Sequence, residues 1–103
     1  MYPKLTAEEV KAMLEKGERV KLVDVREQEE WEEGHIPQAR HIPMGEIPAR
    51  LQELEDDEGP IVFVCRSGAR SARVCDYLHE RGYSVVNMTG GMLAWDGEVV
   101  GRR

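Results

Sequence analysis

One cysteine of this chain stands where a thiol is readily activated. Cys65 follows the apolar run Ile61 to Val64 and opens the segment Cys-Arg-Ser-Gly-Ala-Arg-Ser, residues 65–71, which leads into a stretch with helical periodicity. A thiol between the carboxyl end of a buried strand and the N-terminus of a helix lies among backbone N–H donors. With Arg66 and Arg70 close by, the segment predicts a thiolate at neutral pH and a site for a bound anion.

The two arginines of this segment differ in their expected roles. Arg66 is the better candidate for reaching a substrate oxyanion, because its planar guanidinium suits bidentate contact. Arg70 either lines the same cradle or holds the loop through an ion pair with an acidic residue such as Asp24. Gly68 allows the tight turn that an anion cradle requires.

The elements that must position these residues alternate between strands and helices. Thr6 to Glu9 predicts a capping box for a short helix that stops at Gly17, and the tail 96–103 is expected to be loosely held. Apolar and helical periodicity predict the remaining elements. The expected strands are 20–25, 39–42, 61–64 and 85–88, and the expected helices are 27–33, 47–54 with Pro48 near its first turn, 71–81, and a short patch at 92–95.

This alternation predicts an α/β layered fold with a central, mainly parallel sheet flanked by helices, in one domain over residues 1–103. Ligands of such sheets bind beyond the carboxyl ends of the strands. Asp24, Cys65 and the residues after Met88 are therefore expected near one edge of the sheet.

Composition narrows the functional classes. The net charge is −6 and no basic run occurs, which argues against nucleic acid as a partner. No apolar stretch approaches the roughly 20 residues that span a bilayer, and the first residues lack an apolar signal segment, so no membrane partner and a cytoplasmic location are expected. Cys75 falls on the expected helix among apolar neighbours and is predicted to be buried. The cysteines and histidines lack metal-ligand spacing, so neither a metal nor a cofactor is expected.

Several separate motifs resemble those of the rhodanese family of sulfurtransferases, in its single-domain, thiosulfate sulfurtransferase-like form. Residues 24–26 (Asp-Val-Arg), 30–31 (Glu-Trp) and 34–37 (Gly-His-Ile-Pro) are similar to the family's first signature, and Ile42-Pro43 follows at the expected distance. Residues 65–71 resemble its active-site loop, and Gly90-Gly91 with Ala94-Trp95 resemble its closing signature. Gln38 and Phe63 depart from the family pattern, where a glycine and a tyrosine are common.

The resemblance implies a cysteine that cycles through a persulfide. Cys65 would take a sulfane sulfur from a donor such as thiosulfate and pass it to cyanide or a thiol, with a thioredoxin-like protein or a sulfur carrier as possible protein partners. Asp24 and Arg26 are expected to support the loop, with Arg26 paired to Glu30 or another glutamate of its helix. The predicted site comprises Cys65 as the catalytic residue; Arg66, Ser67, Gly68, Ala69 and Arg70 as substrate-binding residues; and Asp24, Arg26 and Ser71 as supporting residues.

Two other functions remain open at this point. A cysteine-dependent phosphatase or arsenate reductase of the same fold also uses a loop that runs from a cysteine to an arginine, with five residues between them in those enzymes. Here only the four residues 66–69 intervene, and this smaller cradle favours a single sulfur atom. The other alternative is a non-catalytic rhodanese-like binding module, against which an intact Cys65 argues.

Overall fold

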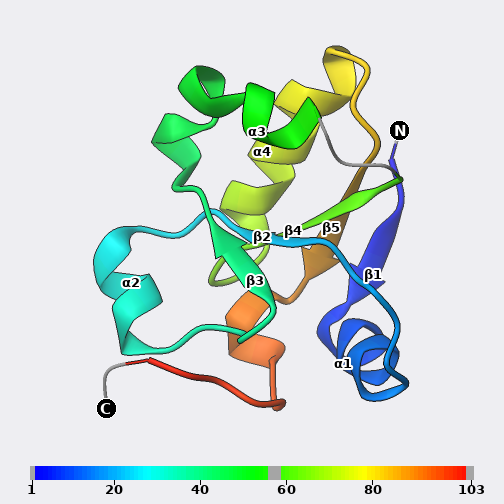
Figure 1. The fold of residues 1–103 in the computed structure, drawn as a ribbon, viewed down its shortest axis with the longest axis vertical. Helices are drawn as coiled ribbons and strands as arrows, with labels where there is room; N and C mark the ends of the chain where they lie inside the picture. The colour runs from blue at the N-terminus through cyan, green and yellow to red at the C-terminus, as the bar shows by residue number, and fades with distance from the viewer. Residues whose placement is uncertain (1, 56–58, 102–103) are drawn as a thin grey trace.

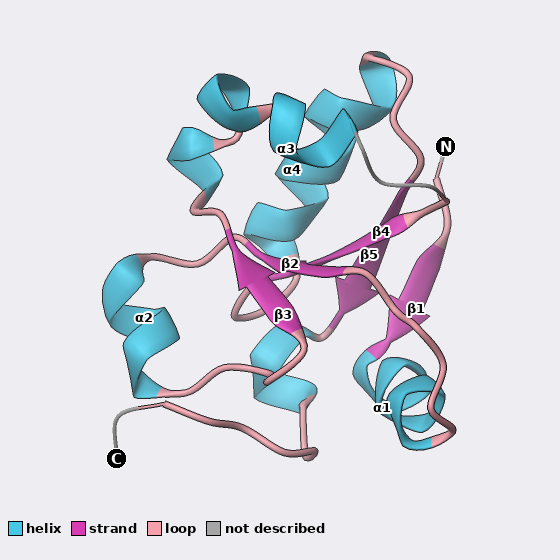
Figure 2. Cartoon of the chain, viewed as in Figure 1, coloured by secondary structure: helices cyan, strands magenta, loops and turns pink. Residues whose placement is uncertain are grey.

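A parallel five-stranded sheet forms the centre of the molecule (Figures 1 and 2). The structure is a computed structural model and describes residues 2–55 and 59–101. The strands are β1 (Lys4–Thr6), β2 (Leu22–Asp24), β3 (Ala39–His41), β4 (Ile61–Val64) and β5 (Val85–Thr89). The helices are α1 (Ala7–Glu15), α2 (Gln28–Glu33), α3 (Gln52–Glu55) and α4 (Ala69–Glu80), with short 3₁₀ turns η1 (Met44–Glu46), η2 (Pro48–Arg50) and η3 (Gly91–Ala94). The predicted α/β fold with a parallel sheet is confirmed.

The strand order β1-β5-β4-β2-β3 places β4 at the centre of the sheet. All four residues of β4 are buried, which explains why its sequence is apolar without alternation. The chain reverses its direction across the sheet between β2 and β4, since β3 lies outside β2 and the chain then returns to form β4. Ligands of open parallel sheets bind at such a switch point, beyond the carboxyl ends of the strands. Asp24 ends β2 and Cys65 follows β4, so both lie there as expected.

Two hydrophobic cores cover the two faces of the sheet, because successive side chains of a strand point to opposite sides. Phe63 and Val23 belong to the first core, which α4 and the segment from η1 to α3 close. Val62 and Val64 belong to the second, which α1 and η3 close. Figure 1 shows α3 and α4 on one side of the sheet and α1 on the other. The cysteine loop connects β4 to α4, and Cys65 belongs to the first core together with Val74 and Cys75 of α4.

Helix α1 begins as the sequence predicts. Thr6 Oγ1 accepts a hydrogen bond from Glu9 N at 3.0 Å, and Glu9 Oε1 accepts one from Thr6 N at 2.8 Å. This reciprocal capping box satisfies two of the backbone donors that a helix N-terminus leaves free. Among the described residues, no helix is long and apolar enough to cross a bilayer.

The predicted helix over residues 47–54 is wrong. The chain forms η1, η2 and the short α3 instead, with 3₁₀ hydrogen bonds from Arg50 N to Ile47 O at 3.1 Å and from Leu54 N to Leu51 O at 2.9 Å. Pro48 has no N–H to donate and therefore cannot continue an α-helical ladder from the preceding turn. The apolar side chains still point inward, and Ile47 and Leu54 are both buried.

Near both ends of the described chain, segments make contacts that the sequence did not predict. Lys4–Thr6 was not expected to be a strand, yet it pairs with β5 as the edge strand β1. The expectation of a loosely held tail is wrong at Val100, which exchanges backbone hydrogen bonds of 2.8 and 2.9 Å with His35, and for residues 102–103 it lies outside the described residues. These bonds join the tail to His35, just beyond the C-terminal end of α2.

Candidate active site

The sulfur of Cys65 lies at the N-terminus of α4 and accepts hydrogen bonds from it. Gly68 N donates to Sγ at 3.0 Å and Ser71 N at 3.4 Å, and the Ser71 hydroxyl oxygen also lies 3.4 Å from Sγ, within reach for donation. The first N–H groups of a helix have no partner within the helix, so they are available to a negative charge placed at its end. The geometry favours the thiolate form.

The pKa of Cys65 follows from this balance. Burial of the side chain raises the pKa, whereas hydrogen bonds from Ser71, Gly68 and Ser67 lower it, and the net shift is downward. Cys75 shows what burial does without such donors: its thiol is also fully buried, and desolvation raises its pKa to about 12. The predicted burial of Cys75 is confirmed.

Close backbone packing fixes the shape of the loop. Gly68 has φ +102°, and a Cβ there would lie 3.4 Å from Gly90 N. On the opposite side, Met92 N donates to Cys65 O and Leu93 N to Arg66 O, both at 2.9 Å. The 3₁₀ turn η3, which Gly90 and Gly91 begin, therefore binds the carbonyl groups of the loop, while the start of α4 supplies N–H groups to the sulfur.

The ion pairs near the loop differ from the predicted ones. Arg26 pairs with Asp24 rather than with Glu30, donating from Nη2 to Oδ2 at 2.9 Å and from Nε to Oδ1 at 3.0 Å. Arg70 pairs with Glu30 rather than with Asp24, at 2.7 and 2.8 Å. The observed partners follow from position in the chain and in the fold. Arg26 follows Asp24 by two residues and its side chain folds back onto that carboxylate, whereas Glu30, on α2, faces Arg70 in the first turn of α4.

Each pair has a distinct consequence. Asp24 is fully buried and also accepts from Arg26 N at 3.0 Å, while Arg26 donates to Gly34 O at 2.8 Å, so this pair ties the end of β2 to the end of α2. The bidentate hydrogen bonds from Arg70 lower the pKa of Glu30 to about 2. Because Glu30 occupies its guanidinium, Arg70 holds the loop in place in this structure.

Arg66 has a different setting. It is exposed and lines a hollow of about 410 Å³ together with Arg26, three glutamates of the α2 region and two residues of η3. The other lining residues are Glu29, Glu30, Glu33, Met92 and Leu93. Of the remaining predicted residues, Ser67 and Ala69 are exposed, and Ser71 is buried.

Sequence reasoning missed two contributors to this site. Asn87, 4 % exposed on β5, contacts both Ser71 and Gly68, and Glu30 is the partner of Arg70. A signal for Asn87 was present, since an amide in an otherwise apolar buried strand needs a hydrogen-bond partner. For Glu30 no signal distinguished it from the other glutamates of its helix.

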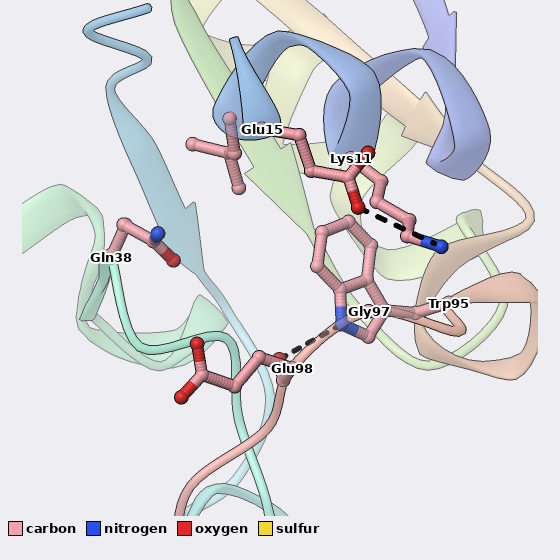
Figure 3. A pocket seen from close by; sticks show the side chains of 7 residues that line it. Lys11, Glu15, Gln38, Trp95, Gly97 and Glu98 are labelled. Carbon is pink, nitrogen blue, oxygen red and sulfur yellow. Dashed lines mark hydrogen bonds and ion pairs between the residues drawn. The ribbon is translucent and has the colours of Figure 1, made fainter. Parts of the chain in front are cut away.

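A second hollow, of about 280 Å³, lies between α1 and the tail (Figure 3). Its lining residues are Lys11, Leu14, Glu15, Gln38, Trp95, Gly97 and Glu98. Trp95 is partly buried against the second core and donates from Nε1 to Glu98 O at 3.1 Å. Lys11 pairs with Asp96 and Glu15. None of its lining residues belongs to the cysteine loop.

A family model for the rhodanese-like domain matches residues 6–98. This chain belongs to the rhodanese family. It is 53 % identical over 89 residues to "Putative sulfurtransferase YtwF" of Bacillus subtilis, with 86 % of this chain and 85 % of that protein covered. It is 41 % identical over 96 residues to a protein of Allochromatium vinosum named "Sulfurtransferase", with 92 % and 89 % covered.

The fold agrees with this membership. The crystal structure of a rhodanese-like domain protein from Staphylococcus aureus superposes with a TM-score of 0.88 at 39 % identity, covering 98 % of this chain and 99 % of that one. The resemblance drawn from the motifs around Asp24, Cys65 and Gly90 is thus confirmed, and with it membership of a family of sulfurtransferase enzymes.

Proposed function

We propose that this protein transfers a sulfane sulfur from a donor such as thiosulfate to cyanide or a thiol through a persulfide on Cys65. The observation that carries the proposal is the set of donors around Sγ: Gly68 N at 3.0 Å and Ser71 N and Oγ at 3.4 Å. They stabilise a sulfur anion at the end of α4. A thiolate is the attacking form of cysteine in sulfur exchange.

The reaction balances in two steps. In the first, the Cys65 thiolate attacks the outer sulfur of thiosulfate, the sulfur–sulfur bond of thiosulfate breaks, and sulfite leaves with that bond's electron pair. In the second, cyanide attacks the outer sulfur of the persulfide and leaves as thiocyanate, which restores the thiolate. The backbone donors of Ser67, Gly68 and Ser71 serve a thiolate and a persulfide alike, because each carries one negative charge.

The state of Arg70 argues for sulfur transfer over phosphate hydrolysis. A cysteine phosphatase of this fold needs the arginine at the end of its loop to bind phosphate oxygens. Here Glu30 occupies that guanidinium through two short hydrogen bonds. The gap of four residues between Cys65 and Arg70 also makes the loop smaller than a phosphate-binding loop. Both features favour binding of a single sulfur atom over binding of a phosphate group.

The test is a thiosulfate-to-cyanide transfer assay with wild type and Cys65→Ser, combined with intact-mass measurement after incubation with thiosulfate. Thiocyanate formation and one added sulfur in the wild type, and neither in Cys65→Ser, are the expected results. Cys75→Ser is the matched control and should retain both, because Cys75 is buried on α4 with a raised pKa. Absence of the added sulfur in the wild type would favour a binding module, and hydrolysis of an aryl phosphate would favour the phosphatase.

A further inference from the structure

The orientation of the Asn87 side chain is fixed by a backbone carbonyl. Asn87 Nδ2 lies 3.3 Å from Gly68 O, which only accepts hydrogen bonds, so the amide nitrogen must face it. Asn87 Oδ1 then faces Ser71 Oγ at 2.5 Å. Since Oδ1 is also an acceptor, this contact requires the hydroxyl of Ser71 to donate.

The Ser71 hydroxyl has one proton and more than one acceptor within reach. Gly68 O lies 3.2 Å from Oγ, but its two lone pairs are already used by Ala72 N at 3.1 Å and by Asn87 Nδ2. The remaining acceptors are Asn87 Oδ1 at 2.5 Å and Cys65 Sγ at 3.4 Å. The hydroxyl can donate to one of these at a time.

We propose that Asn87 is a positioning residue that competes with the Cys65 sulfur for the Ser71 hydroxyl, so that the hydroxyl changes partner with the charge on Sγ. When Sγ is uncharged, as a thiol or as the inner sulfur of a persulfide, the hydroxyl donates to Asn87 Oδ1, the shorter contact. When Sγ is a thiolate, a charge-assisted hydrogen bond draws the hydroxyl to sulfur. The hydroxyl rotates and keeps its own proton, while the thiol proton leaves to solvent.

This competition sets how easily Cys65 ionises. Forming the thiolate takes the donor away from Asn87 Oδ1, a buried acceptor, and that loss opposes ionisation. Asn87 therefore favours the neutral sulfur and Ser71 favours the thiolate. Gly68 and Ser71 donate to Sγ from the backbone in either case. Arg70 and Cys75, both on α4, interact electrostatically with Cys65, and the variants leave the charge of Arg70 unchanged.

The test measures the thiolate directly, through the pH dependence of Cys65 alkylation by iodoacetamide, with Cys75→Ser in every protein. The variants are Ser71→Ala, Asn87→Leu and the double variant, where leucine matches the size of asparagine without its hydrogen bonds. Thr89→Val is the matched control on the same strand, since its hydroxyl contacts Leu5 O at 3.4 Å and not the loop. If Asn87→Leu unfolds, Asn87→Ala replaces it in both backgrounds.

The expected result is a coupling between the two positions. The effect of Asn87→Leu is compared with the Ser71 hydroxyl present and with the hydroxyl removed by Ser71→Ala. At a pH below the pKa of Cys65, Asn87→Leu raises the thiolate fraction about tenfold more in the first background than in the second. Loss of the Asn87 bond to Gly68 O affects both backgrounds equally and cancels in this comparison. Equal effects of Asn87→Leu in the two backgrounds would overturn the proposal.

This inference rests on the proposed role of Cys65 but is measured apart from it. Alkylation of Cys65 does not depend on sulfur transfer, and the pH dependence of its rate reports the thiolate fraction, so the coupling is observable whether or not the protein transfers sulfur. A protein that shows the coupling and forms no persulfide would refute the proposed function alone. One that forms the persulfide with uncoupled variants would refute the role of Asn87 alone.

Discussion

Gly91→Ala should destabilise the protein more than a Gly→Ala replacement at any other turn glycine. A Cβ at Gly91 would lie 2.5 Å from both Cys65 O and Arg66 O, and 2.6 Å from Arg66 C. These are backbone atoms of the cysteine loop and cannot rotate away. The residue also has φ +55°, a conformation that side chains disfavour.

The magnitude has two parts. Adopting a left-handed conformation costs a non-glycine residue about 1–2 kcal/mol, and forcing an additional carbon into a packed interior costs about 1–3 kcal/mol. The sum of about 2–5 kcal/mol is a large share of the stability of a domain this size. It corresponds to a fall in Tm of roughly 8–40 °C, since about 1 kcal/mol shifts the Tm of such a domain by 4–8 °C.

Gly17→Ala is the matched control. Gly17 has φ +80°, and a Cβ there would meet nothing within 4 Å, so this variant carries only the conformational cost. Thermal and urea unfolding of both variants isolates the crowding contribution as the difference between them. We also expect Gly91→Ala to lose sulfur transfer at temperatures where it remains folded, because the loop carbonyls must move. A Gly91→Ala protein no less stable than Gly17→Ala would refute the reasoning.

Three further outcomes follow from the charges around the loop. Asp24→Ala should cost about 3–5 kcal/mol of stability together with activity, because it leaves the buried Arg26 unpaired; loss of activity at an unchanged Tm would instead indicate a direct role in the reaction. Glu30→Gln should cost about 1–2 kcal/mol in urea unfolding at pH 7, allowing for partial exposure. Because folding lowers the pKa of Glu30 to about 2, this contribution is present above the unfolded pKa and lost as the pH falls through about 2, so the gap between variant and wild type must narrow in acid. Replacing both Glu29 and Glu33 by Gln removes two negative charges from the hollow lined by Arg66 and should lower KM for thiosulfate about two- to threefold at low salt. A reduction of KM that persists at high ionic strength would contradict an electrostatic origin.

The parts of the fold that the sequence predicted are those where local pattern and tertiary position agree. Val64 closes a wholly apolar strand, and Thr6 with Glu9 forms a cap that needs no distant partner. Where local pattern conflicts with backbone chemistry, the prediction was wrong. Ile47 and Leu54 have helical spacing, but Pro48 lacks the N–H that would carry an α-helical ladder on from η1, and the segment is divided into 3₁₀ turns and the short α3.

The sequence was sufficient to identify the candidate nucleophile but not the residues that hold its loop in place. Cys65 is identified by the strand before it and the glycine turn after it, both of which are local in sequence. The partner of Arg70 is 40 residues away and lies on a helix with several equivalent glutamates. Only the tertiary placement of α2, which brings Glu30 within hydrogen-bond reach of Arg70, selects this glutamate.

The charges that surround Cys65 show where its activation originates. The guanidinium of Arg70 is matched by the carboxylate of Glu30, and that of Arg26 by Asp24, so neither is an uncompensated cation beside the sulfur. Hydrogen bonds from backbone N–H groups and from the Ser71 hydroxyl lower the pKa of Cys65 instead. Such donors are held by the turn at Gly68 and depend little on ionic strength, whereas exposed charges are screened. The reactivity of this thiol should therefore be more sensitive to the backbone of its loop than to salt or to the loss of any one arginine.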